Sequence, residues 1–274
     1  MRETVKRILS GLIFGAIFII SLNNYFSFTL LIFILGLIST YEFNKLTSQS
    51  TIGYHISFSI IYIYFALTEF YLNSNLQLNS WFNDLKDTLL IFSIFVSLFL
   101  LKDLFSSKNL PGIIIKKYFR FIFYITSSFI FIYLIANFKG FYDPSIILGC
   151  FILIWANDSF AYIVGKSFGK QKLFYSISPH KTVEGFLGGL LFCCISASIV
   201  SRYIDETLST SNWLIIAIIV SVFGTLGDLI ESKLKRESNV KDSGKILPGH
   251  GGILDRLDSI IFASPYIYLF LKLI

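Results

Sequence analysis

The sequence predicts an all-α, polytopic integral membrane protein with about nine transmembrane helices and a cytoplasmic N-terminus. Of its 274 residues, 54% are hydrophobic and only 15% are charged, and the mean hydropathy is +0.70. Soluble domains of ordinary composition carry about 25% charged residues. Runs of about 20 apolar residues recur along the chain, which is the length needed to cross a hydrocarbon core of about 30 Å. This composition excludes a soluble helical domain.

Nine apolar runs form the predicted helices. They occupy residues 7–22, 25–43, 52–71, 87–101, 118–137, 144–163, 184–203, 212–231 and 257–273. The segments 73–86 and 102–117 are expected to be polar or amphipathic connections. The first run follows basic residues, as in a signal peptide, but it lacks a small-residue cleavage site and a second apolar run follows at once. We therefore expect a retained first helix.

A single membrane domain over residues 1–274 is predicted, because neither an internal repeat nor a low-complexity linker divides the chain. Residues 1–140 supply helices with little motif content, and residues 141–274 contain nearly all the unusual chemistry. Gly185 and Gly189 have the GxxxG spacing typical of close helix packing. The three cysteines lie in apolar runs without CxxC spacing, which predicts neither a zinc site nor a disulfide.

The orientation follows from the basic residues. If the N-terminus is cytoplasmic, only four of the 23 Lys and Arg residues fall outside, and the other 19 lie inside; the four are Lys86, Lys139, Arg202 and Lys272. Basic residues concentrate on the cytoplasmic side of membrane proteins. The sequence thus predicts cytoplasmic loops at 164–183 and 232–256, a C-terminus on the other side, and a location in the inner (plasma) membrane.

Carboxylates inside or at the ends of apolar runs are the first candidates for function. Asp158 lies within the sixth run, where an ionised side chain costs about 3 kcal/mol and normally faces a cavity or a partner. Asp228 and Glu231, and then Asp255 and Asp258, are each spaced to share one helix face. Mg²⁺ prefers such oxygen ligands. A structural pair, or an acidic residue that complements a helix dipole, is the alternative interpretation.

Basic residues and glycines surround these carboxylates. Lys181 stands between apolar residues and glycines without an evident partner, which predicts that it binds a substrate phosphate. The other members of this cationic set are Lys233, Lys235, Arg236, Lys241 and Lys245. The "PGHGG" turn supplies flexible backbone that can approach an anion closely, and His250 within it could donate to phosphate or stabilise the turn. Together the pattern indicates phosphate chemistry with a divalent metal at a membrane surface.

Residues 232–258, "SKLKRESNVKDSGKILPGHGGILDRLD", resemble the signature of CDP-diacylglycerol synthases, also called phosphatidate cytidylyltransferases. Every fixed position of that signature is filled, by Ser232, Lys235, Arg236, Lys241, Asp242, Gly244, Pro248, His250, Gly251, Gly252, Asp255, Arg256 and Asp258. The stretches "SPHKTVEGFLGG" and "GDLIESKLKR" also look like blocks of this family. In the first, His180 stands where members usually have Lys, and Val183 where they often have Trp.

The resemblance implies that CTP reacts with phosphatidate to give CDP-diacylglycerol and pyrophosphate in phospholipid biosynthesis. It implies catalytic roles for Asp158, Lys181, Asp228, Asp255 and Asp258, with Mg²⁺ on Asp228, Asp255 and Asp258. Substrate contacts are expected at Ser178, Lys181, Ser232, Lys235, Arg236, Lys241, Asp242, His250, Gly251, Gly252 and Arg256. The partners expected are CTP, phosphatidate and the lipid bilayer, with no nucleic acid. The resemblance also leaves room for a second, monovalent cation and for a homodimer.

Two alternatives stay open at the level of sequence. The chain could transfer a cytidylyl group to another lipid phosphate. It could also be a cation-coupled transporter with Asp158 and Asp228 as ion sites, although this does not explain why carboxylates and cations gather on one side. A CDP-alcohol phosphotransferase would need an Asp-Gly-x-x-Ala-Arg motif, and the chain has no Asp-Gly dipeptide.

Overall fold

The computed structural model describes residues 3–47, 52–75, 80–105, 117–249 and 251–274. The first half contains α1 (Glu3–Ser21), α2 (Tyr25–Leu46), α3 (Ile52–Asn75) and α4 (Ser80–Phe105), followed by α5 (Lys117–Arg120), the π-helix η1 (Phe121–Thr126) and α6 (Ser127–Ala136). The second half contains α7 (Ser145–Phe168), β1 (Lys172–Phe174), β2 (Ser178–Thr182), α8 (Val183–Tyr203), α9 (Thr210–Glu237) and α10 (Leu254–Leu273).

Each predicted apolar run corresponds to helical structure, so the predicted helices are confirmed in position. The fifth run is filled by α5, η1 and α6, which follow one another without a break. Within the described residues, 7 helices are long and apolar enough to cross a membrane: α2, α3, α4, the α5–α6 segment, α7, α8 and α9. The described apolar part of α1, Leu9–Ser21, is shorter. The chain is therefore a nearly all-α, multi-pass membrane protein. Nine spans and a cytoplasmic N-terminus stay predictions.

The fourth helix is longer than its apolar run, so residues 80–86, which we expected to belong to a polar or amphipathic connection, are helical instead. α4 begins at Ser80 because this segment is amphipathic. Phe82 is fully buried and packs against Phe65 of α3, with ring centroids 5.5 Å apart. Lys86 pairs with Glu69 of α3 at 3.3 Å. The second expected connection, 102–117, falls partly in α4, and its residues 106–116 lie outside the described part of the chain.

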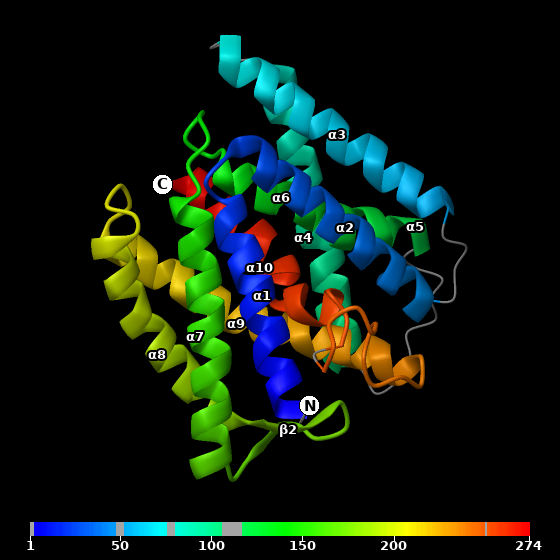
Figure 1. Cartoon of the computed structure of the whole chain (residues 1–274), viewed down its shortest axis with the longest axis vertical. Coiled ribbons are helices and arrows are strands. Elements are labelled where there is room, and N and C mark those ends of the chain that lie inside the picture. Colours follow the sequence, from blue (N-terminus) through cyan, green and yellow to red (C-terminus); the bar gives the residue numbers. More distant parts are fainter. Residues whose placement is uncertain (1–2, 48–51, 76–79, 106–116, 250) are drawn as a thin grey trace.

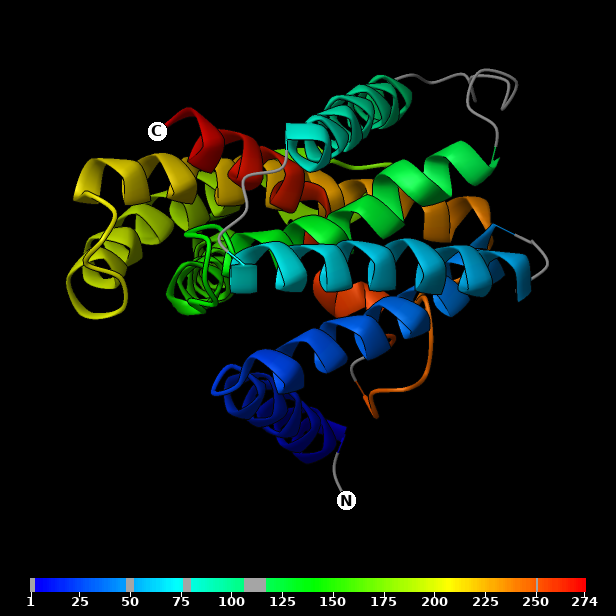
Figure 2. The same cartoon turned by 90° about the horizontal axis from the view of Figure 1, so that it is seen from above.

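The helix α6 lies at the centre of the bundle, where all of its residues are buried. Figure 2 shows α1 and α4 on opposite sides of the molecule with α6 between them. In the second half, α8 packs against α7 and α9, and α9 packs against α10 (Figure 1). The prediction of close packing at Gly185 and Gly189 is confirmed, since a Cβ at either position would press on backbone oxygens of α7.

A short antiparallel hairpin, which the all-α prediction did not include, occupies much of the expected loop 164–183. β1 pairs with β2, with Lys172 opposite Thr182. The Thr182 hydroxyl caps α8 by accepting a hydrogen bond from the Gly185 N–H at 3.1 Å. The Glu184 carboxylate accepts bonds from the Lys170 and Gln171 N–H groups at 3.0 and 3.1 Å. These contacts tie the hairpin to α8.

Candidate active site

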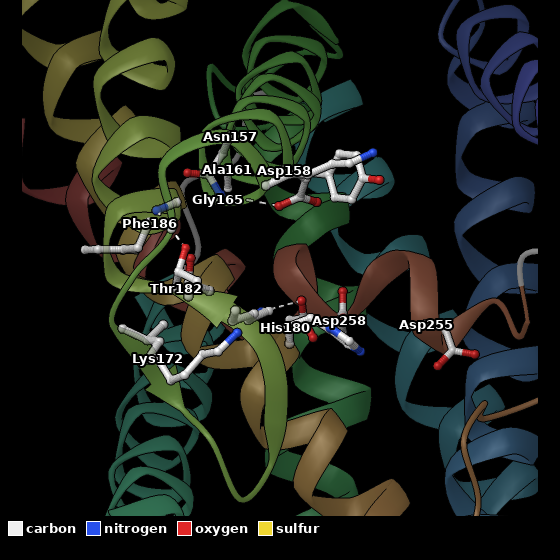
Figure 3. Close-up of a pocket in the computed structure, with 18 of the residues that line it drawn as sticks. Asn157, Asp158, Ala161, Gly165, Lys172, His180, Thr182, Phe186, Asp255 and Asp258 are labelled. Atoms are coloured by element: carbon white, nitrogen blue, oxygen red, sulfur yellow. Dashed lines mark hydrogen bonds and ion pairs between the residues drawn. The ribbon is translucent and has the colours of Figure 1, made fainter.

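A cavity of about 780 Å³ opens where the hairpin meets α7, α8, α9 and the start of α10. Figure 3 shows side chains from these elements turned toward one another. Eight predicted site residues line the cavity: Asp158, Lys181, Asp228, Lys235, Asp242, Asp255, Arg256 and Asp258. His180, Lys166 and Lys172 add further basic side chains to its wall. The volume lies within the range of ordinary small-molecule sites.

Lys181 and Asp228 form an ion pair inside this cavity. The Lys181 Nζ lies 2.5 Å from the Asp228 Oδ2, and both side chains are partly exposed. Ser232, one turn further along α9, donates to the other oxygen of Asp228 at 3.2 Å. The expectation that Lys181 lacks a partner is therefore wrong, because that partner lies on a helix far away in the sequence.

Asp158 is oriented by its neighbour Asn157. The Asn157 amide accepts a hydrogen bond from Ser221 of α9 at 2.7 Å and donates to the Asp158 Oδ1 at 3.3 Å. Ser221 and Asn157 are buried, whereas Asp158 is exposed to the cavity. Sequence reasoning missed Asn157, although a buried amide beside an intramembrane carboxylate is itself a signal.

Asp255 has partners for both of its carboxylate oxygens. Oδ1 lies 2.6 Å from the Lys235 Nζ. Oδ2 accepts hydrogen bonds from the Ser243 N–H and hydroxyl, each at 3.0 Å, and from the Gly252 N–H at 2.7 Å. In Figure 3, Asp255 lies apart from Asp158 and Asp258. Its carboxylate therefore joins Lys235 to the loop between α9 and α10.

The described residues of that loop, 238–249 and 251–253, contribute most of the wall of a second cavity of about 700 Å³. Lys241, Lys245 and Arg256 line it together with Gly249 and Gly251, both of which have positive φ. Asp242 and Arg256 line both cavities, so the two are adjacent. The second cavity is rich in cations and in exposed backbone, which suits a polyphosphate.

Other predicted residues lie away from the two cavity walls. Ser178 is in β2 opposite Phe174. Lys233 pairs with Asp103 of α4 at 2.9 Å. Neither wall includes Ser178, Ser232, Arg236 or Gly252. The expectation for His250 lies outside the described residues.

The carboxylates fit a magnesium ion that is shared with a substrate. In the described ranges, no group of three His, Cys, Asp or Glu side chains could hold a metal ion by itself. Mg²⁺ is usually bound by one or two carboxylates together with phosphates and water. Asp158, Asp228 and Asp258 bring oxygen ligands from three helices to one cavity, so they suit this open kind of site.

Comparisons with known proteins agree with this chemistry. The sequence profile described as "Cytidylyltransferase family" matches residues 5–274. A protein of Bacillus subtilis (strain 168) named phosphatidate cytidylyltransferase is 53% identical over 122 residues, which are 44% of this chain and 45% of that protein. A Staphylococcus haemolyticus protein of the same name is 50% identical over 125 residues, 46% of this chain and 48% of its own length.

A third relative, from Staphylococcus saprophyticus, bears the same name and aligns over a longer stretch. It is 42% identical over 195 residues, which are 70% of this chain and 72% of that protein. The chain thus aligns with about half of the first two relatives and with most of the third. Since the family profile spans nearly the whole sequence, the chain belongs to the cytidylyltransferase family.

Proposed function

We propose that this protein is a phosphatidate cytidylyltransferase of phospholipid biosynthesis, which converts CTP and phosphatidate into CDP-diacylglycerol and pyrophosphate. One observation carries the proposal: the Lys181–Asp228 pair, Asp158 and Asp258 converge in a cavity that adjoins the cationic loop pocket. The relatives named phosphatidate cytidylyltransferase supply the substrate class.

The reaction needs positioning and charge neutralisation more than a strong base. The lipid phosphate has a second pKa of about 6, so at neutral pH it is largely a dianion. One of its oxygens attacks the α-phosphorus of CTP and forms the new P–O bond. The bond from that phosphorus to the oxygen bridging to the β-phosphate breaks, and its electron pair leaves with pyrophosphate. Cationic side chains that meet the developing charge lower the barrier.

We assign the two substrates to the two cavities by their linings. Lys241, Lys245 and Arg256 would hold the β- and γ-phosphates of CTP in the loop pocket. Lys181 and His180 would hold the lipid phosphate in the larger cavity. Arg256 belongs to both walls, so it would lie beside the α-phosphorus, where the two substrates meet.

Magnesium is the expected cofactor, and Asp228 and Asp258, supported by Asp158, are the residues that would hold it. When bound, Mg²⁺ would neutralise charge on the phosphates that meet in the larger cavity. Asp255, which lies apart from Asp158 and Asp258 and contacts both Lys235 and the Gly252 N–H, would keep Lys235 and the loop in place. The second, monovalent cation and the homodimer stay predictions.

The membrane supplies the lipid substrate. Tyr162 and Phe186 line the larger cavity, and the neighbouring Ile163 and Leu187 are exposed apolar side chains on α7 and α8. Acyl chains could therefore remain in the bilayer beside these helices while the head group enters the cavity. The basic hairpin and loop favour a site that faces the cytoplasm, where CTP is present, in the inner (plasma) membrane.

An assay with purified protein tests this function. CTP labelled at the α-phosphate is mixed with Mg²⁺ and detergent micelles that contain phosphatidate, and labelled lipid and pyrophosphate are measured. We expect the two products in equal amounts. Micelles with a polyprenyl phosphate distinguish the other lipid-phosphate activity. Labelled lipid with the polyprenyl phosphate alone, or none with either lipid, would contradict the proposal.

A further inference from the structure

A buried carboxylate in the first half of the chain reaches the start of the helix that carries Asp255 and Asp258. Glu42 belongs to α2 and is only 1% exposed. Its Oε2 accepts a hydrogen bond from the Leu254 N–H at 2.8 Å, and its Oε1 accepts one from the Ile253 N–H at 3.2 Å. The first N–H groups of a helix lack partners within the helix, and a negative charge there is favourable. Glu42 therefore caps α10 from a separate helix.

The loop between α9 and α10 closes over the same carboxylate. The Ser243 hydroxyl lies 3.2 Å from the Glu42 Oε2. A Cβ at Gly244 or at Gly252 would overlap the Glu42 carboxylate. With Glu42 in this place, a side chain at Gly244 would displace its carboxylate, and one at Gly252 would displace both that carboxylate and the Ser243 hydroxyl. This role differs from contact with a phosphate.

The contacts continue from Glu42 to the cavity wall. The Ser243 hydroxyl also lies 3.0 Å from the Asp255 Oδ2, and the Asp255 Oδ1 lies 2.6 Å from the Lys235 Nζ. Asp255 and Lys235 line the larger cavity. The hydroxyl has one proton and can donate to only one of the two carboxylates at a time. Through its contacts with the Ile253 and Leu254 N–H groups, Glu42 holds the start of α10, and through Ser243 it holds the loop.

We propose that Glu42 is a positioning residue for cytidylyl transfer. It acts through the N-terminus of α10 and through Ser243, which together set the places of Asp255, Arg256 and Asp258 in the cavity. It touches neither substrate. This inference rests on the proposed function and adds a residue outside the signature on which that function was recognised.

The variant Glu42→Gln tests the inference. Glutamine keeps the size, but its amide NH₂ must face at least one donor among the Leu254 N–H, the Ile253 N–H and the Ser243 hydroxyl. The matched control is Glu69→Gln, because Glu69 is also a buried carboxylate of the first half, 7% exposed and paired with Lys86. The melting temperature of each variant is measured in detergent. The kcat per folded molecule and the KM for CTP are then measured at a temperature well below both melting temperatures.

We expect kcat of Glu42→Gln to fall by at least about tenfold, whereas Glu69→Gln stays within about twofold of wild type even where its melting temperature falls equally. A purely structural role would lower the melting temperature of both variants and leave kcat per folded molecule unchanged. That result would overturn the inference.

A second variant decides the question if Glu42→Gln does not fold. Gly244→Ala keeps Glu42 but places a methyl group against its carboxylate, and its control is Gly15→Ala, where an added Cβ meets nothing within 4 Å. The same loss of kcat is expected for Gly244→Ala alone. Wild-type kcat in Gly244→Ala, or failure of both test variants to fold, would overturn the inference.

An inactive wild type would refute the proposed function itself, whereas an active wild type with active variants refutes only the role of Glu42.

Discussion

Lys181 of the hairpin and Asp228 of α9 lie 2.5 Å apart within one cavity, although 47 positions separate them in the chain. The pair places a cation and an acidic oxygen where a phosphate and a metal ion would each need one. It is formed because the hairpin folds back from α7 and is held by the cap at the start of α8.

Replacing Lys181 with glutamine removes the cation and keeps a polar side chain of similar length. Turnover should fall at least tenfold, which corresponds to a loss of about 1.4 kcal/mol of transition-state stabilisation. Initial rates against both CTP and phosphatidate measure the effect. The control Lys170→Gln removes an exposed charge from the same loop, outside the cavity walls. If both variants have wild-type kinetics, Lys181 does not bind a substrate, and its positive charge serves only to set the topology.

Asp255→Asn separates a supporting role from metal binding. The substitution removes the charge that pairs with Lys235, and it turns the new NH₂ group toward either Lys235 or the Ser243 and Gly252 N–H groups. We expect a fall in kcat of at least about tenfold, with the Mg²⁺ concentration at half-maximal rate unchanged. A Mg²⁺ titration of the variant and of wild type measures both quantities. A large shift in half-saturation would instead make Asp255 a magnesium ligand, as the sequence predicts.

The orientation can be checked with reporters. A reporter active only in the cytoplasm should be silent when fused after Ile274, because 19 of the 23 basic residues lie on the opposite side in the predicted topology. Figure 1 shows the C-terminus and the hairpin toward opposite ends of the molecule, which supports the prediction. The same reporter inserted after Gln171 should be active. Activity at the C-terminus would mean that the number of spans is wrong.

The helices could be predicted because long apolar runs carry their own signal. The start of α4 could not, since its apolar residues Trp81, Phe82 and Leu85 are interspersed with polar and charged residues, and the burial of Phe82 depends on α3. The hairpin escaped prediction because "KLF" and "SPHKT" are too short and too polar to indicate strands. Hydrogen bonds from the Lys170 and Gln171 N–H groups to Glu184 of α8 help to hold it in place, and these join residues 14 and 13 positions apart.

The functional site, like the fold, could be predicted from the sequence only in part. The sequence identified eight residues that do line the larger cavity, five of them within the signature, because motifs and carboxylates in apolar runs mark chemistry. It could not reveal that Lys181 pairs with Asp228 or that Asp255 is engaged by the loop, since these contacts depend on tertiary structure. Glu42 was missed for a different reason. It ends an apolar run, and the rule that an acidic residue in such a run needs a partner, applied to Asp158, would have found it.

The most direct test of the account is the dependence of CDP-diacylglycerol formation on Mg²⁺ in Asp228→Asn. Asparagine keeps the size and one oxygen but loses the charge that pairs with Lys181 and would hold the metal. The control Asp103→Asn breaks a comparable pair, Asp103 with Lys233 at 2.9 Å, outside the cavities.

Radiolabelled CTP and phosphatidate micelles are used across a series of Mg²⁺ concentrations, with folding checked by size-exclusion chromatography. The account predicts a loss of at least about a hundredfold for Asp228→Asn, partly restored by raised Mg²⁺ or by Mn²⁺, and a rate within about twofold of wild type for Asp103→Asn. A near-normal rate in Asp228→Asn, or full activity of the wild type in excess chelator, would contradict it.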